Sequence, residues 1–378
     1  MKKVFLKSLA LCLIVSSCNQ NDLFNSQMNN EETPTIQVET TTPTMRKAQT
    51  ASFVQQNPSL FGKNVMIFES YNELDSTLNL IQEMDYKELR AWATDNNVTN
   101  DILESNIIYN EEWKKAEEYC NPTTPLQPYP GGTINLIDIP GTIPPAITLE
   151  EKTMERFIKT MQQKYPQYLQ EYDSLGEHYV EPLGSIDEKA LTNEKHLFLI
   201  NNEVHRFYTD GFVLCAMEDY HEIATFNSKE EVVQYINEKK NSQQKAPQVS
   251  VITNYSPKQF EAISGKYKIT TDFIVGQMRS IWGTDLRHID VSVRNYHKTK
   301  RGYWLGIACK TDYHLRAQTT CSANKQYTFN ITHKGYTLSW HRRYYKTLNG
   351  SGNRLWLTSY VLNVSNQHGL TINKENYK

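Results

Sequence analysis

The stretch HLFLINNEVHRFYTDGFVLCA, residues 196–216, decides the fold of the central part of the chain. It contains three short runs rich in apolar and aromatic residues, and the pairs Asn201-Asn202 and Asp210-Gly211 separate them. Such pairs form tight turns between antiparallel strands, because Asn, Asp and Gly tolerate the backbone angles that these turns require. The stretch therefore predicts a three-stranded antiparallel meander.

Helices are predicted before and after this meander. A short apolar strand at 65–68 precedes Ser70 and Glu73, which have the spacing of a capping box, and Asp85 and Glu88 repeat that pattern. Leu74, Leu78 and Ile81 follow the first cap at helical spacing, which places them on one buried face. Further helices are expected at 101–119, at 148–172 with a division at Pro166, and at 228–236.

The C-terminal third has the pattern of a β domain. A polar segment, Asn241–Pro247, changes the composition, and short runs rich in Tyr, Trp, Ile, Val and Thr follow it at regular intervals. These runs lie at 287–295, 303–309, 326–332, 335–345 and 354–364. The sequence thus predicts an α+β N-terminal domain followed by a mainly antiparallel β domain, which is sandwich- or barrel-like.

The N-terminus has the features of an export signal. Lys2 and Lys3 precede a short apolar run, which is too short to span a bilayer, and Val15-Ser16-Ser17-Cys18 resembles the lipobox of bacterial lipoproteins. We expect cleavage before Cys18 and acylation of its thiol with palmitate-type chains, which anchors the protein in the cell envelope. The outer membrane is the expected location, and the sequence leaves the membrane face open.

Composition then divides the chain into four segments. These are a signal peptide at 1–17, a disordered tether at 18–50, an acidic α+β domain at 51–245 and a basic β domain at 246–378. The acidic domain contains a Pro-rich insertion at 121–147 that cannot sustain a helix.

The net charge of −2 conceals a strong asymmetry between the halves. Residues 246–378 contain 19 Lys and Arg against 6 Asp and Glu, a balance of +13, which leaves −15 for residues 1–245. The basic half can recruit an anionic partner, or it can simply dock on the acidic half. The sequence leaves both interpretations open.

The strongest binding candidate is the segment 340–345. On a strand its side chains alternate between two faces, so aromatic and cationic groups occur on both. Because one face must be core, we expect the other to present an aromatic and cationic surface to solvent, although cross-strand structural pairing is the alternative. Such a surface suits sugar rings and acidic groups. The candidate ligand-binding residues are Trp340, Arg342, Arg343, Tyr344 and Tyr345.

Four cysteines remain after removal of the signal and acylation of Cys18. In an exported protein these cysteines can be oxidised to two disulfides, in three possible pairings. The short spacing between Cys309 and Cys321 favours that pair. Buried free thiols are the alternative for all four.

We found no sequence motif for catalysis, for a phosphate-binding loop or for a dinucleotide site, and we expect no catalytic residue, cofactor or metal. The predicted function is therefore binding or interaction without catalysis, with an anionic glycan or a neighbouring envelope protein as partner. Nucleic acid is a poor partner for an exported lipoprotein. A hydrolase of a glycan or envelope polymer is one alternative, since paired carboxylates need no motif. A structural envelope component is the other.

Two groups of residues resemble a known family. Phe68, Ser70, Leu74, Met84, Glu88 and Trp92 form the first, and Asn201, Phe207, Tyr208, Asp210 and Gly211 form the second. In both, the sequence resembles lipoproteins of gut Bacteroidales. That family has no assigned activity, so the resemblance implies an envelope location and this domain layout, and it implies no reaction.

Overall fold

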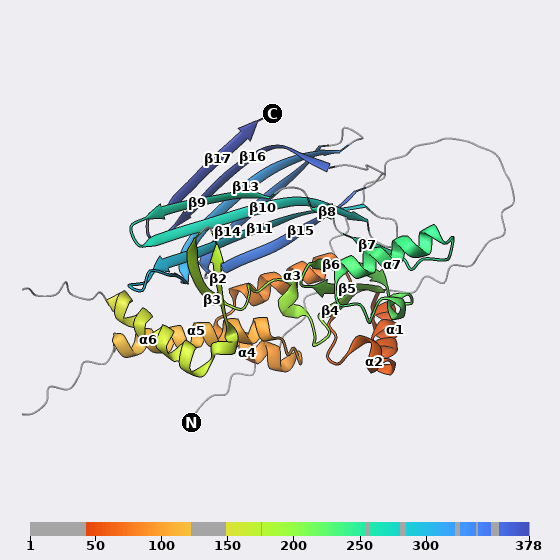
Figure 1. The fold of residues 1–378 in the computed structure, drawn as a ribbon, viewed down its shortest axis with the longest axis horizontal. Helices are drawn as coiled ribbons and strands as arrows, with labels where there is room; N and C mark the ends of the chain where they lie inside the picture. Colours follow the sequence, from red (N-terminus) through yellow and green to blue (C-terminus); the bar gives the residue numbers. More distant parts are fainter. Residues whose placement is uncertain are drawn as a thin grey trace, which may run out of the picture. The chain divides into compact units, whose positions relative to one another are not determined.

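The computed structural model describes residues 43–121, 149–174, 176–251, 253–254, 257–279, 285–321, 326–337, 339–348 and 355–377 (Figure 1). The predicted signal peptide, Cys18, most of the predicted tether and the Pro-rich insertion from residue 122 onward lie outside these ranges. Residues 42–378 form one compact unit. No helix in the described part of the chain is long and apolar enough to span a bilayer.

The predicted meander is the centre of the first sheet. Its strands run in the order β1-β4-β5-β6-β7, with β1 parallel to β4 and the other neighbours antiparallel. Asn201, with φ of 53°, turns the chain between β4 and β5 in the left-handed conformation that Asn tolerates. The bounds are β1 (Ile67–Phe68), β4 (Leu197–Ile200), β5 (Glu203–Tyr208), β6 (Gly211–Ala216) and β7 (Val249–Val251).

Helices cover both faces of this sheet. Apolar side chains of α3 (Tyr71–Glu83), α4 (Tyr86–Asp95) and α5 (Asp101–Cys120) pack against one face, and those of α1 (Pro43–Gln56), α2 (Pro58–Phe61) and α7 (Lys229–Asn241) pack against the other. The predicted caps are confirmed, because Ser70 accepts a hydrogen bond from the backbone N–H of Glu73 at 3.2 Å and Asp85 forms a capping box with Glu88. Leu74, Leu78 and Ile81 are fully buried, as their spacing predicts.

Two predicted boundaries are wrong in detail. Helix α1 begins at Pro43, inside the predicted tether, because Val54 packs in the core and Thr50 donates a hydrogen bond to the Asn202 side chain at 2.6 Å. Helix α6 (Leu149–Lys164) ends before Pro166, and the residues after it form strand β2 instead of the second part of a helix. The short 3-10 helices are η1 (Pro166–Tyr168), η2 (Glu188–Leu191) and η3 (Tyr220–Glu222).

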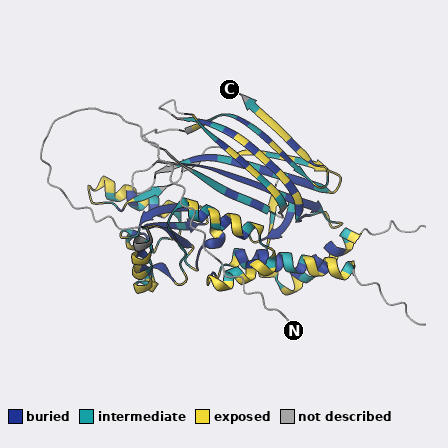
Figure 2. Ribbon diagram, turned by 180° about the vertical axis from the view of Figure 1, so that it is seen from behind, coloured by how far each residue is buried: buried dark blue, intermediate teal, exposed yellow. Residues whose placement is uncertain are grey.

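The C-terminal part is a sandwich of two open sheets. One contains β2 (Leu169–Ser174), β3 (Glu177–Pro182), β8 (Thr253–Asn254), β9 (Lys258–Ser264), β10 (Tyr267–Arg279), β11 (Asp285–Lys298), β12 (Trp304–Gly306) and β15 (Ser339–Leu348). The other contains β13 (Cys309–Cys321), β14 (Gln326–Thr337), β16 (Leu355–Asn366) and β17 (Thr371–Tyr377). Buried and exposed residues alternate along β13 of the second sheet (Figure 2), whereas β11 of the first is buried on both faces over residues 287–293. Buried apolar residues of both sheets form the core between them. The mainly antiparallel β prediction is confirmed, in its sandwich form.

The border predicted between residues 245 and 246 does not coincide with a border between sheets. Strand β7 follows that border yet completes the first sheet, and β3 precedes it yet pairs in parallel with β12 of the sandwich. The second half therefore contributes β7 to the first sheet, and the first half contributes β2 and β3 to the sandwich.

Candidate functional site

The segment predicted as a solvent-exposed binding surface is buried. It forms most of β15, which pairs with β11. Trp340 is 3% exposed and packs in the sandwich core opposite Val293, and Arg342 is also 3% exposed. The expectation of an aromatic and cationic face in solvent is thus wrong, because both faces of β15 are covered, one by the second sheet and one by the N-terminal half.

Arg343 is the centre of the buried contacts. Its Nε and Nη2 donate to the two carboxylate oxygens of Asp290 at 2.6 and 2.7 Å, and its Nη1 donates to Glu188 at 3.0 Å. The Tyr345 hydroxyl donates to the other oxygen of Glu188 at 2.7 Å. Burial raises the pKa of Asp290, but the charge of Arg343 more than offsets this and holds the pKa below its usual range. For Glu188, burial outweighs Arg343 and leaves the pKa raised.

The neighbouring residues of β15 also reach the N-terminal half. His341 Nδ1 lies 2.6 Å from the carboxylate of Asp187, and Arg342 donates to the backbone carbonyl of Asp75 at 2.7 Å and to the side chain of Asn79. These contacts fix β15 against α3 and against the segment that leads into η2. The alternative of structural pairing therefore describes this segment better than ligand binding.

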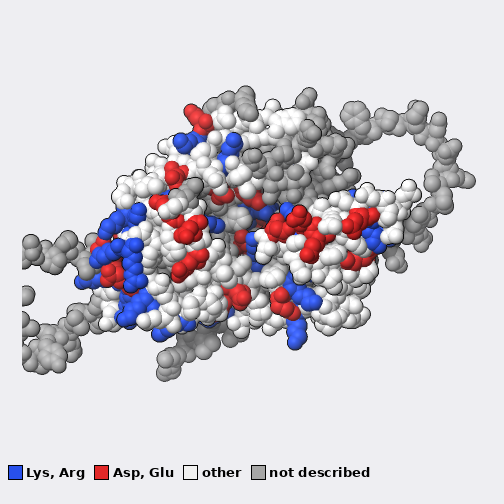
Figure 3. Space-filling model, viewed as in Figure 1, with Lys and Arg blue, Asp and Glu red and all other residues white. Residues whose placement is uncertain are grey.

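Other ion pairs join the halves with the same polarity. Lys268 binds Glu177 at 2.8 Å, Arg294 lies 3.4 Å from Glu181, and Lys300 lies 3.3 Å from Glu155. In each pair the acid comes from the first 245 residues and the base from the rest. Internal docking thus accounts for much of the charge asymmetry. What stays on the surface in Figure 3 is a group of Lys and Arg side chains at one end, over α6, and acidic groups toward α7.

The predicted Cys309–Cys321 disulfide does not form in this structure. Cys309 is a free buried thiol, and the two cysteines begin and end strand β13. An extended strand of this length separates its ends by about 40 Å, far beyond disulfide distance. Cys215 is also a free buried thiol. Burial raises the pKa of Cys309 to about 12, which leaves it protonated and a poor nucleophile.

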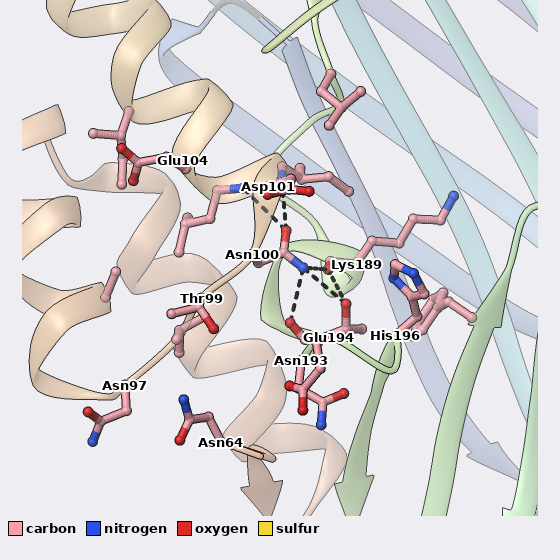
Figure 4. Close-up of a pocket in the computed structure, with 18 of the residues that line it drawn as sticks. Asn64, Asn97, Thr99, Asn100, Asp101, Glu104, Lys189, Asn193, Glu194 and His196 are labelled. Atoms are coloured by element: carbon pink, nitrogen blue, oxygen red, sulfur yellow. Dashed lines mark hydrogen bonds between the residues drawn. The ribbon is translucent and has the colours of Figure 1, made fainter. Parts of the chain in front are cut away.

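A pocket of about 1310 Å³ opens where the α4–α5 connection faces η2 and the start of β4 (Figure 4). We call it the α4–α5 pocket. It exceeds the roughly 300–1,000 Å³ of typical small-molecule sites, so it has room for an extended ligand. Exposed amide and hydroxyl side chains line it, among them Asn64, Asn97, Thr99, Thr209 and Asn227.

Two asparagines hold the walls of this pocket in place. The Asn100 side chain caps α5 by accepting from the backbone N–H of Ile102 at 2.9 Å, and it donates to the carbonyls of Lys189 and Thr192 at 2.9 and 3.0 Å. Asn193, which is 3% exposed, donates to the carbonyl of Phe61 at 2.8 Å. The lining is therefore preorganised, since its supports are hydrogen-bonded before any ligand arrives.

Three lining residues adopt left-handed backbone conformations. Asn64, Asn97 and His196 have φ values of 52°, 53° and 57°. Asn97 ends α4 in the usual manner of a helix C-terminus, with its N–H donating to Thr94. These conformations direct short polar side chains of three separate segments to one opening.

The charges around the pocket are largely neutralised. Arg90 binds Glu104 at 3.2 Å and Glu111 at 2.7 Å, and the Glu194 carboxylate accepts the backbone N–H of Lys63 at 2.6 Å. None of the lining carboxylates, Asp101, Glu104 and Glu194, is buried. A glycosidase needs an acid whose pKa burial has raised, and the described pocket offers no buried carboxyl for that role. In the described residues no group of three or more His, Cys, Asp or Glu is placed to hold a metal.

Comparisons with known proteins add little. No protein-family model matches the sequence, and neither does any protein of curated function. Among solved structures, a DUF4848 family protein from Bacteroides thetaiotaomicron is similar at 10% sequence identity, with 83% of this chain and 99% of that chain covered and a TM-score of 0.20. A likeness this weak supports no structural argument.

Sequence reasoning missed the α4–α5 pocket altogether. Its residues come from α4, α5, η2, β5 and the loops between them, and no spacing in the sequence joins these segments. Asn96-Asn97 signals the end of a helix, which is correct, but nothing local shows that the same residues face η2.

Proposed function

We propose that the chain is a lipid-anchored protein of the bacterial envelope that binds a glycan in the α4–α5 pocket. The leader and the Cys18 pattern support the anchor. The observation that carries the ligand is a large pocket lined by exposed amides and hydroxyls on hydrogen-bonded supports. These groups can donate and accept hydrogen bonds with the hydroxyls of a sugar. An acidic glycan belongs to this class, because Lys189 and His196 lie exposed on the lining.

Binding fits the site better than hydrolysis. None of the pocket carboxylates is buried. Glu104 already binds Arg90, and Glu194 already accepts a backbone N–H, so both stabilise the pocket walls and are not free to act as catalytic acids. The basic half is also a weaker partner surface than its charge suggests, because Arg342 and Arg343 are buried against the N-terminal half.

Two measurements test the proposal. Mass spectrometry of the protein from membranes should find an acylated Cys18 at the N-terminus, and Cys18→Ser should release the protein from the membrane fraction. Recovery of an intact Met1 would remove the anchor.

The ligand is tested on a glycan array, with calorimetry on the sugars that bind. The double variant Asn97→Ala with Thr99→Ala should lose about fivefold to 150-fold in affinity, because each exposed group contributes roughly 0.5–1.5 kcal/mol when it bonds a ligand. Trp356→Ala, an exposed aromatic on β16, is the matched control and should bind as the wild type does. Equal affinity of all three proteins, or retention of an envelope protein in place of sugars, would reject the pocket as a glycan site.

A further inference from the structure

Arg287 lies at one end of the sandwich, between the two sheets. It is on β11 directly opposite Gln277 of β10, on the same side as the core residue Ile289. The hairpin pairing ends two residue pairs further on, at Arg279–Asp285. Although it is so near the end of the strands, Arg287 is only 1% exposed.

The guanidinium of Arg287 has no polar partner among the residues that the structure describes. None of the described residues accepts a hydrogen bond from its Nε, Nη1 or Nη2. The one electrostatic contact described for it is a cation–π contact with Tyr327 on β14, in which the Arg287 Cζ lies 4.8 Å from the ring centroid. Tyr327 is half-buried and lies beside the last pair of β13 and β14, so this contact is at the same end of the sandwich.

Other buried cations of these sheets behave differently. Lys268 has Glu177 at 2.8 Å, Arg342 has Asp75 at 3.5 Å and Arg343 has Asp290 at 2.6 Å. A buried charge without a counter-ion is strongly unfavourable, because it has lost its hydration. A cation–π contact with one aromatic ring offsets only part of that cost. Among these cations, Arg287 is therefore the one for which no described residue supplies a negative group.

We propose that Arg287 binds an oxyanion, the carboxylate, sulfate or phosphate group of a ligand that enters at this end of the sandwich. Tyr327 covers the face of the guanidinium and leaves its N–H edge for two parallel hydrogen bonds to the oxyanion. The site is separate from the α4–α5 pocket, which lies on the α/β part of the chain. It accepts either a free inorganic anion or the acidic group of a glycan.

The test compares thermal unfolding of the full mature chain in a buffer low in anions and in sulfate, at constant ionic strength set with chloride. Arg287→Met removes the charge at similar length, and Arg316→Met removes an exposed arginine of β13 as the matched control. Without sulfate, Arg287→Met should unfold at the same or a higher temperature than the wild type. With sulfate, the wild type and Arg316→Met should both gain several degrees more than Arg287→Met. General stabilisation by sulfate affects all three proteins alike and cancels in this comparison.

A second measurement keeps the test decisive if Arg287→Met fails to fold. Calorimetry should detect sulfate binding to the wild type and weaker binding to Arg287→Lys. Lysine keeps the positive charge but lacks the two parallel N–H donors of the guanidinium. A parallel titration with a uronic acid oligosaccharide shows whether the acidic group belongs to a glycan, by binding more tightly than sulfate does. The proposal is overturned if Arg287→Met is less stable without sulfate and responds to it as the wild type does, or if the wild type binds neither anion.

Discussion

The β15 interface and the α4–α5 pocket use charged and polar side chains in opposite ways. At the interface, Glu188 and Asp290 are buried, and both bond Arg343, whose side chain is 11% exposed. At the pocket, the amides of Asn64 and Asn97 are exposed, and the charges beside them are paired at the surface. The charged groups of the interface are bonded within the protein, whereas the pocket presents hydrogen-bonding groups to solvent.

This difference teaches that charge along a sequence is a poor guide to partners. The segment with the most conspicuous cations and aromatics, residues 340–345, is buried or half-buried along its whole length. A buried charge must have a counter-charge, so a strongly basic half folded onto a strongly acidic half can satisfy itself. Polar groups that are exposed on rigid supports are then the better candidates for ligand binding, and the composition of the sequence does not distinguish them.

The largest effect is expected from breaking the interface at Arg343. Arg343→Met leaves Glu188 and Asp290 buried without a cation, which should lower the free energy of unfolding by about 3–5 kcal/mol. Urea unfolding measures this. Arg316→Met, which removes an exposed arginine on β13, is the control and should change stability by less than about 0.5 kcal/mol. Adding Glu188→Gln to Arg343→Met should recover part of the loss. If the two arginine variants are equally stable, the interface does not hold the halves together.

Much of the local structure could be predicted because its signals are local. Ser70 and Asp85 cap helices through residues two or three positions away, and Asn201 and Gly211 mark turns by their own backbone preferences. The regularly spaced runs rich in aromatic and β-branched residues after residue 247 predict the β domain for the same reason. These features need no knowledge of distant parts of the chain.

The contacts that define the two sites are of another kind. Glu188 lies 155 positions from Arg343, and Asn100 lies 89 positions from its acceptor on Lys189. No period or motif reports such pairings. Closeness in sequence can even mislead, as with Cys309 and Cys321, which an extended strand keeps far apart.

A smaller effect, on pH dependence, sharpens the comparison. His288 faces the interface and is fully buried, and burial lowers its pKa to about 4 from 6.5. A histidine with a lowered pKa is neutral in the folded protein and takes up its proton on unfolding. The free energy of unfolding that neutral His288 contributes is therefore fully present above pH 6.5. It is lost as the pH falls toward 4, by about 3 kcal/mol in all. In urea unfolding, His288→Gln should lose less stability than the wild type between pH 7 and pH 4.

His341, on the same face of neighbouring β15, should show the opposite sign. Burial lowers its pKa, but the hydrogen bond and charge of Asp187 more than offset this and leave the pKa raised. Its pair with Asp187 therefore stabilises the fold fully below pH 6.5 and weakens as the pH rises through the raised pKa. His341→Gln should cost more at pH 6 than at pH 9. His196→Asn, at the exposed pocket, is the control for replacing a histidine outside the interface and should fold as the wild type does, because Asn accepts the same left-handed backbone. If the profiles of His288→Gln and His341→Gln both run parallel to the wild-type profile, the interface histidines do not set the pH dependence of stability, and the contrast between the two regions would fail.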